Sequence, residues 1–249
     1  PDPTNWWVFV GTDNRAAMFD ERVNTPSHAV TTFTHRWFYY KNVMSIAVLD
    51  VNAVTVQLRV LENWPSAPVA IYDETKGLSG TAIYDWYGYF FSEVTTDISQ
   101  IIFENIPPDV GSGSGYSVYE LTVTGVTGDT VSIGEVVGGE AYELGGTQYG
   151  VSSGITDYSV KNIDDYGNVS ITKRAYSKRM NAKVQVEKEK INGVQLLMYS
   201  IRSTPCVWIG SDDPELQEPL IVFGYTKDFS TEISYPSFAL MNLDVEGLT

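Results

Sequence analysis

Alternation of apolar and polar residues is the dominant pattern in the first half of the chain. Residues 54–60 and residues 119–123 alternate with a period of two, which is typical of a half-buried strand. Residues 45–49 (SIAVL) form a short apolar run that predicts a buried strand, followed by a predicted turn or corner at 50–52. Short strands separated by glycine and proline turns predict a β-sandwich, jelly-roll-like, over residues 1–140.

The second half begins with two further alternating segments. Residues 169–173 and 182–187 are predicted strands, and the turn signal Asp164–Asn168 precedes the first of them. Between the two strands lies the densest positive charge of the chain, in residues 173–179 (KRAYSKR). This segment is therefore the first candidate for an interaction surface.

A helix is predicted at residues 191–203. Its apolar residues Ile191, Val194, Met198 and Ile201 fall on one helical face, and Thr204-Pro205 ends it. Three more strands are predicted at 206–209, 220–225 and 238–245. Strands, one helix and more strands predict an α+β domain over residues 141–249, and the glycines of the segment 134–154 predict the domain boundary.

The composition narrows the class of function. The chain has 249 residues and a formal net charge of −15, which argues against general nucleic-acid binding and against docking on an anionic membrane. Aromatic residues make up 13% and charged residues only 19%, a balance typical of chains that bury surface against copies or partners. No apolar run approaches the ~20 residues of a membrane-spanning helix.

No catalytic or cofactor motif is recognisable. His28 and His35 lack metal ligands at the spacing of a zinc site, and Cys206 lies among apolar neighbours, where a buried inert thiol is expected. We therefore expect no cofactor, no metal and no enzymatic activity. A pair of carboxylates suited to glycoside hydrolysis stays open, because their separation is a spatial quantity.

Several stretches resemble one protein family. They are Gly154–Ser159 (GITDYS), residues 165–180 (DYGNVSITKRAYSKRM), and the segment from Trp208 (WIGS) through Phe223 (FGYTKDF) to Leu248. In the first half, residues 14–20, the strand residues 47–49 and residues 86–91 (WYGYFF) fit the same family. Together these stretches resemble the distal tail proteins of long-tailed phages, which are structural proteins of the tail tip and baseplate.

The resemblance implies a virion protein at the tail tip. It implies a peripheral sandwich like a galectin or a carbohydrate-binding module at 1–140, and a tail-tube-like domain at 141–249 around the channel through which DNA passes. It further implies a ring of six copies, or of three, in contact with the tail tube, the tail hub and fibres. In this chain the sandwich precedes the tube-like domain, the reverse of the order in the well-known distal tail proteins.

The basic residues near the predicted strand at 182–187 admit three interpretations. They can contact a neighbouring subunit, form a solvated face, or touch DNA without reading its sequence, and the subunit interface is the preferred hypothesis. The residues are Lys173, Arg174, Lys178, Arg179 and Lys183.

Aromatic clusters at residues 37–40 and 86–91 are candidates for glycan or partner contact. The residues singled out are Trp37, Trp86, Tyr87 and Tyr89, and the alternative is that they belong to the core of the sandwich. If 86–91 is a strand, Trp86 and Tyr87 point to opposite faces. Two other functions therefore stay open: a carbohydrate-binding adhesion module and an accessory protein of a glycoside hydrolase.

Overall fold

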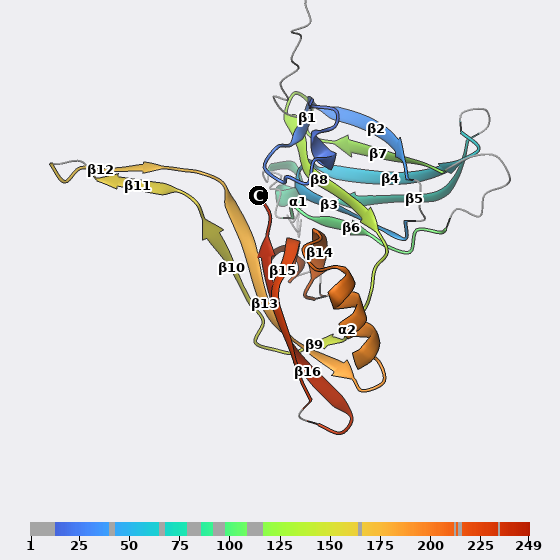
Figure 1. Ribbon diagram of the computed structural model, residues 1–249. Helices are drawn as coiled ribbons and strands as arrows, with labels where there is room; N and C mark the ends of the chain where they lie inside the picture. The colour runs from blue at the N-terminus through green and yellow to red at the C-terminus, as the bar shows by residue number, and fades with distance from the viewer. Residues whose placement is uncertain are drawn as a thin grey trace, which may run out of the picture.

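The computed structural model describes most of the chain as a mainly β protein (Figure 1). The described residues are 13–39, 43–64, 68–78, 86–91, 98–108, 117–163, 166–211, 213, 216–233 and 235–249. The predicted mainly β fold is confirmed.

Residues 27–139 build two antiparallel four-stranded sheets that pack face to face (Figure 1). Alternate residues of the facing strands, among them Val48, Leu58, Leu121 and Ile133, are fully buried between the sheets. The short 3-10 helix η1 (Ala17–Phe19) packs beside them through Met18. One sheet has the order β1 (Ser27–Val30), β8 (Thr130–Gly139), β3 (Ser45–Asn52), β6 (Ile101–Phe103), and the other has the order β2 (Thr32–Phe38), β7 (Val118–Thr124), β4 (Thr55–Glu62), β5 (Val69–Gly77).

Residues 146–247 contribute a third sheet, which has six strands. The helix α2 (Ile191–Ser200) covers one face of this sheet, where Val194 and Met198 join the apolar cluster, as its sequence spacing predicts. The short helix α3 (Gln217–Leu220) leads into the strand that follows it. The order of the sheet is β10 (Ser152–Asp157), β13 (Tyr176–Glu187), β16 (Phe238–Gly247), β15 (Ile221–Glu232), β14 (Cys206–Ile209), with β9 (Gly146–Thr147) also pairing with β13.

A two-stranded ribbon projects from this sheet (Figure 1). It consists of β11 (Val160–Ile163) and β12 (Val169–Thr172), which pair only with each other among the described strands. The ribbon prolongs the pair β10–β13 beyond the edge of the body. Two residues of the predicted turn at its tip, Asp164 and Asp165, lie outside the described residues.

Of the turn or corner predicted at 50–52, a turn that ends the strand is wrong, because β3 continues to Asn52. Asp50 adopts a φ of +51° between the pairs Leu49–Glu135 and Val51–Ile133. Aspartate tolerates this left-handed conformation, and the pairing of β3 with β8 continues beyond it. Opposite it, a Cβ on Gly134 would lie 2.8 Å from the Cβ of Asp50, so only glycine fits there.

Gly134, Gly138 and Gly139, at the start of the glycine-rich segment 134–154, belong to a strand. β8 runs to Gly139, and the next strand begins only at Gly146. At Gly138 a Cβ would lie 2.6 Å from the hydroxyl oxygen of Tyr39. Gly134 and Gly138 therefore allow close packing of other residues on the strand.

Residues 86–91 form the helix α1 (Trp86–Phe91), so the strand interpretation of this segment is wrong. The rings of Trp86 and Phe90 stack at 6.3 Å, and those of Tyr87 and Phe91 lie 4.9 Å apart. Both pairs have the i,i+4 spacing that brings side chains together on a helix. Aromatic residues favour strands by propensity. This run nevertheless forms a helix, in which the rings pair with each other.

An apolar cluster joins the sandwich to the six-stranded sheet. It contains Ala47 and Leu49 of β3 together with Ile221 and Phe223 of β15. Ile46 and Val48 point into the sandwich core, so β3 is buried on both faces. This accounts for its uninterrupted apolar run.

Candidate functional site

The five basic residues selected from the sequence do not form one patch. Lys173 and Arg174 are exposed at the bend between β12 and β13. Arg179 and Lys183 are exposed on one face of β13, where alternation places them opposite the buried Met180 and Ala182. Lys178 lies on the other face of the strand. A subunit contact by these residues stays a prediction.

Lys178 makes its contacts within the chain. Its Nζ donates to the backbone carbonyl of Glu218 at 3.0 Å and pairs with Oε1 of Glu218 at 3.1 Å. The same carboxylate accepts hydrogen bonds from the backbone N–H of Ser99 at 2.9 Å and from its Oγ at 2.7 Å. Lys178 and Glu218 belong to the part of the chain that forms the six-stranded sheet, whereas Ser99 belongs to the sandwich. Lys178, Glu218 and Ser99 therefore form a polar clamp between the two parts.

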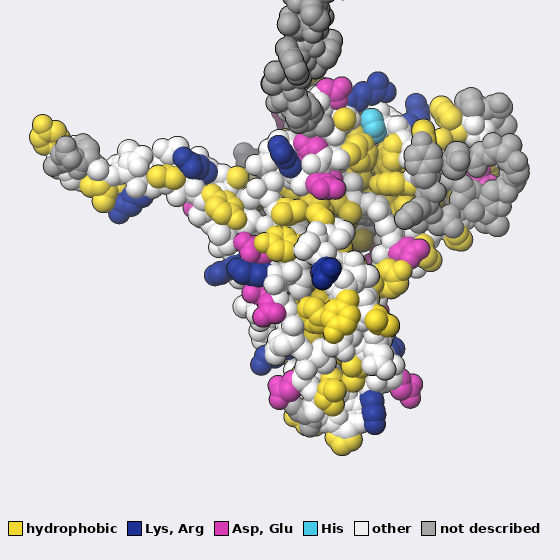
Figure 2. Space-filling model, viewed as in Figure 1, with side chains coloured by type: hydrophobic (Ala, Val, Ile, Leu, Met, Phe, Trp, Pro, Cys, Tyr) yellow, Lys and Arg dark blue, Asp and Glu magenta, His cyan; other side chains and the backbone are white. Residues whose placement is uncertain are grey.

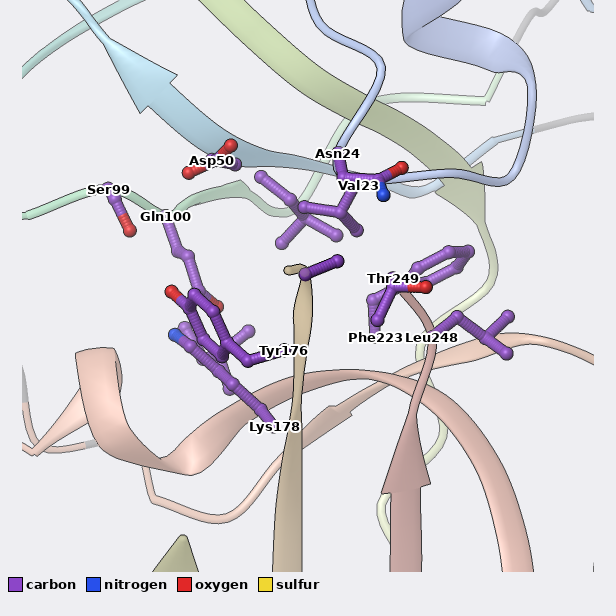
Figure 3. Close-up of a pocket in the computed structure, with 13 residues that line it drawn as sticks. Val23, Asn24, Asp50, Ser99, Gln100, Tyr176, Lys178, Phe223, Leu248 and Thr249 are labelled. Carbon is purple, nitrogen blue, oxygen red and sulfur yellow. The ribbon is translucent and has the colours of Figure 1, made fainter. Parts of the chain in front are cut away.

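A cavity of about 190 Å³ lies beside the clamp (Figure 3). Asp50, Ser99 and Gln100 line it from the sandwich, while Tyr176 and Lys178 line it from β13. Gln100 is only 6% exposed, and its Oε1 has no hydrogen-bond partner among the described residues. The cavity is polar on one side, and Phe223 and Leu248 make its other side apolar.

The charges around this cavity influence one another. Burial raises the pKa of the Asp50 carboxyl above its ordinary value, which the nearby Lys178 opposes and Glu218 reinforces. For Glu218, burial favours the protonated form, but the hydrogen bonds from Ser99 and the charge of Lys178 outweigh it and lower the pKa. Glu218 is therefore held as a carboxylate, which is the form that accepts both Ser99 bonds and the lysine.

The projecting ribbon is amphipathic. Its pairing places Lys161, Ile163, Val169 and Ile171 on one face, and Val160, Asn162, Ser170 and Thr172 on the other. Ile171 is 72% exposed and Ile163 is 62% exposed, and hydrophobic side chains gather along the ribbon in Figure 2. The face with Ile163, Val169 and Ile171 thus has the apolar residues of a strand pair that packs on a hydrophobic core. No described part of the chain covers this face.

The aromatic candidates have different surroundings. Trp37 is partly buried and packs with Phe19, His35 and Tyr119, so it is part of the sandwich core. Trp86 and Tyr87 are exposed on α1, at 79% and 73%. The side chain of Tyr89 lies outside the described residues.

Sequence reasoning did not identify the clamp. Glu218 and Ser99 are 119 residues apart, and neither belongs to a motif. The signal that was visible, the positive charge at 173–179, identified Lys178 but not its partner. The pairing follows only from the packing of β3 and β15 against each other.

The described part of the chain lacks two features that would indicate a metal site or a membrane span. There, no group of three or more His, Cys, Asp or Glu residues is arranged to hold a metal ion. No helix in the same residues is long and apolar enough to cross a membrane.

Comparison with known proteins adds no relative. No protein-family model matches the chain, and no curated protein matches it with significance.

Proposed function

We propose that the protein is a structural component of the tail tip of a long-tailed phage, where copies associate into a ring of the distal tail protein type. The apolar face of the ribbon β11–β12 is the single observation that carries the assembly part of this proposal. The resemblance of residues 154–180 and 208–248 to distal tail proteins supports the location.

The apolar face favours contact with another protein chain. An isolated two-stranded hairpin is marginally stable in water, and one with exposed aliphatic residues is a target for pairing and packing by other chains. Val169, Ile171 and Ile163 lie on one face of the ribbon and are all exposed. Covering them removes apolar surface from water at about 25 cal/mol per Å². A second copy of the chain is the proposed occupant, because a ribbon that projects from every copy can pack on its neighbour around a ring.

The clamp between the sandwich and the sheet fits the same role. Because Glu218 binds both Ser99 and Lys178, the sandwich is held against the sheet from which the ribbon projects. In a ring of such copies the sandwiches would lie at defined places on the outside, available to fibres or other tip proteins.

The assembly part is tested with substitutions on opposite faces of the ribbon. Ile171→Asp puts a charge on the apolar face, and Ser170→Asp puts the same charge on the polar face as the matched control. We expect Ile171→Asp to raise the dissociation constant of the oligomer by about a hundredfold or more, since a carboxylate is costly to bury. Light scattering after size exclusion measures the mass at several concentrations.

Salt distinguishes the apolar contact from an electrostatic one. An assembly held by the ribbon keeps its mass when the salt concentration rises from about 50 mM to about 500 mM, because an apolar contact is not screened. An assembly held by exposed basic residues dissociates over the same range, because salt screens its charges. Equal masses for the Ile171→Asp and Ser170→Asp proteins would refute the ribbon as the contact.

The proposed location at the tail tip is tested on phage particles. Immunogold labelling of phage particles that carry this chain is expected at the tail tip. Label on the capsid, or particles that contain none of the protein by mass spectrometry, would contradict the proposed function.

A further inference from the structure

The cavity beside the polar clamp has two chemically different sides. In Figure 3, Asp50, Gln100 and Lys178 lie on one side of it, and Phe223 and Leu248 lie on the other. An engineered cavity of about 150 Å³ in another protein binds benzene. At about 190 Å³, the cavity between the sandwich and the six-stranded sheet can therefore hold an organic molecule of roughly six to eight heavy atoms.

Asp50 carries the charge in this cavity that lacks a direct partner. Among the described residues, none forms a hydrogen bond or a salt bridge with its carboxylate. Lys178 lines the same cavity, but its Nζ is engaged by the backbone carbonyl and the carboxylate of Glu218, at 3.0 Å and 3.1 Å. The acids Asp50 and Glu218 thus outnumber the single lysine, and one negative charge is left uncompensated when both are ionised.

Gln100 adds a buried hydrogen-bond acceptor to the same side. Its Nε2 donates to Oε1 of Glu218 at 3.3 Å, and because a carboxylate only accepts, this contact determines which end of the amide is the nitrogen. Oε1 of Gln100 is the other end, and it has no hydrogen-bond partner among the described residues, although Gln100 is only 6% exposed. A buried acceptor without a donor is unfavourable, so this group favours an occupant that can donate.

These features select the chemistry of an occupant. Water would satisfy the acceptors but would gain nothing against Phe223 and Leu248, and a wholly apolar molecule would leave the Asp50 carboxylate without a partner. An anion would be repelled by Asp50 and Glu218. A cation that bears N–H groups at one end and hydrocarbon at the other matches both sides of the cavity.

We propose that this cavity binds a small aliphatic primary amine in its ammonium form. The ammonium group pairs with the Asp50 carboxylate and donates to Gln100, and the hydrocarbon part lies against Phe223 and Leu248. Since the cavity is lined by both the sandwich and the six-stranded sheet, an occupant contacts both parts and stabilises their junction. The proposal goes beyond the structural role and does not depend on the formation of a ring.

Three probes of equal length and different charge test the site on the full chain. They are n-hexylamine, 1-hexanol and hexanoate, measured by saturation-transfer NMR at neutral pH. Salt at about 150 mM limits the general attraction of cations to a chain with a net charge of −15. We expect a dissociation constant on the order of 1 mM or lower for n-hexylamine, binding at least about tenfold weaker for 1-hexanol, and none for hexanoate.

Two variants inside the cavity and one outside it locate the site. Asp50→Asn removes the charge and keeps the shape, and asparagine also tolerates the φ of +51° at this position, so n-hexylamine should bind about tenfold more weakly or worse. Gln100→Met keeps the length of the side chain, removes the acceptor and should weaken binding by about threefold or more. Asp129→Asn removes the same charge from the exposed turn between β7 and β8 and is the matched control, with binding unchanged.

Four results would overturn the proposal. They are the absence of n-hexylamine binding, equal binding of 1-hexanol, preferential binding of hexanoate, and a loss with Asp129→Asn as large as that with Asp50→Asn. Thermal melting verifies that each variant is folded, and Asp50→Asn decides the question if Gln100→Met is not. The Ile171→Asp protein is expected to bind n-hexylamine as the parent does, so failure of the ring and failure of the amine site are distinguishable.

Discussion

At the scale of single residues, the most unusual environment is that of Glu135 in β8. The residue is only 3% exposed, and the acidic Asp20 and Glu21 lie near it, as does the phenol of Tyr39. Burial, with a contribution from Asp20, raises the pKa of its carboxyl to about 8, although the backbone N–H groups of Arg22 and Glu21 oppose the shift. At neutral pH the protonated form is therefore favoured in the folded protein.

This environment makes stability depend on pH. The folded protein holds a proton that the unfolded chain releases near pH 4.5, so this group destabilises the fold increasingly as the pH rises from about 4.5 to about 8. Glu135→Gln keeps the shape and removes the charge. We expect the variant to match the parent protein near pH 4 and to be more stable by roughly 2 kcal/mol above pH 8. Thermal melting from pH 4 to pH 9 measures this, and parallel curves for the two proteins would contradict it.

At the scale of secondary-structure elements, β8 shows how glycine permits close packing in a strand. A Cβ at Gly134 would lie 2.5 Å from the carbonyl oxygen of Val23, whereas one at Gly139 would meet nothing within 4 Å. The two glycines belong to the same strand, and neither has a positive φ. The sequence alone does not distinguish them, because the neighbours of Gly134 come from β3 and from the loop at Val23.

The two glycines form a matched pair for mutation. Gly134→Ala is expected to destabilise the fold by about 2 kcal/mol or more, since backbone must move to accept the methyl group. Gly139→Ala is expected to change stability by less than about 0.5 kcal/mol. Chemical denaturation of both variants measures the difference, and equal losses would show that the close approach at Gly134 has no energetic effect.

At the scale of the whole molecule, the junction between the sandwich and the six-stranded sheet combines an apolar cluster with a polar clamp. Leu49, Ile221 and Phe223 of the apolar cluster bury hydrophobic surface between the two parts. The contacts of Glu218 with Ser99 and Lys178 fix how the two parts are oriented. Apolar contact is not directional, whereas hydrogen bonds to a carboxylate are. The clamp should therefore govern the relative orientation of the two parts more than their stability.

Removal of the lysine tests this division. Lys178→Met keeps the length of the side chain and removes the ion pair, at an expected cost of about 1–2 kcal/mol. The loosened junction should speed cleavage by glutamyl endopeptidase after Glu140 and Glu143, which are exposed between β8 and β9. Lys183→Met, on the exposed face of β13, is the control and should be cleaved at the parental rate. Equal rates for both variants would mean that the apolar cluster alone holds the junction.

The sequence by itself determined the elements whose patterns are local. The alternation at 54–60, the apolar run at 45–49 and the helical spacing of Val194 and Met198 each appear in the structure as predicted, because one face of each element must be buried. The mainly β class followed from the same patterns. The strand β14 has the predicted bounds, 206–209.

Only the tertiary structure decided which residues meet. Asp50 stays within a strand because Gly134 lies opposite, Lys178 faces Glu218 because β15 packs on β3, and Arg36, Glu120, Arg59 and Asp73 form one row because four strands are in register. These partners come from distant parts of the chain. A one-dimensional pattern records how each residue alternates along its own element, whereas register and packing between elements depend on long-range contacts that no local pattern contains.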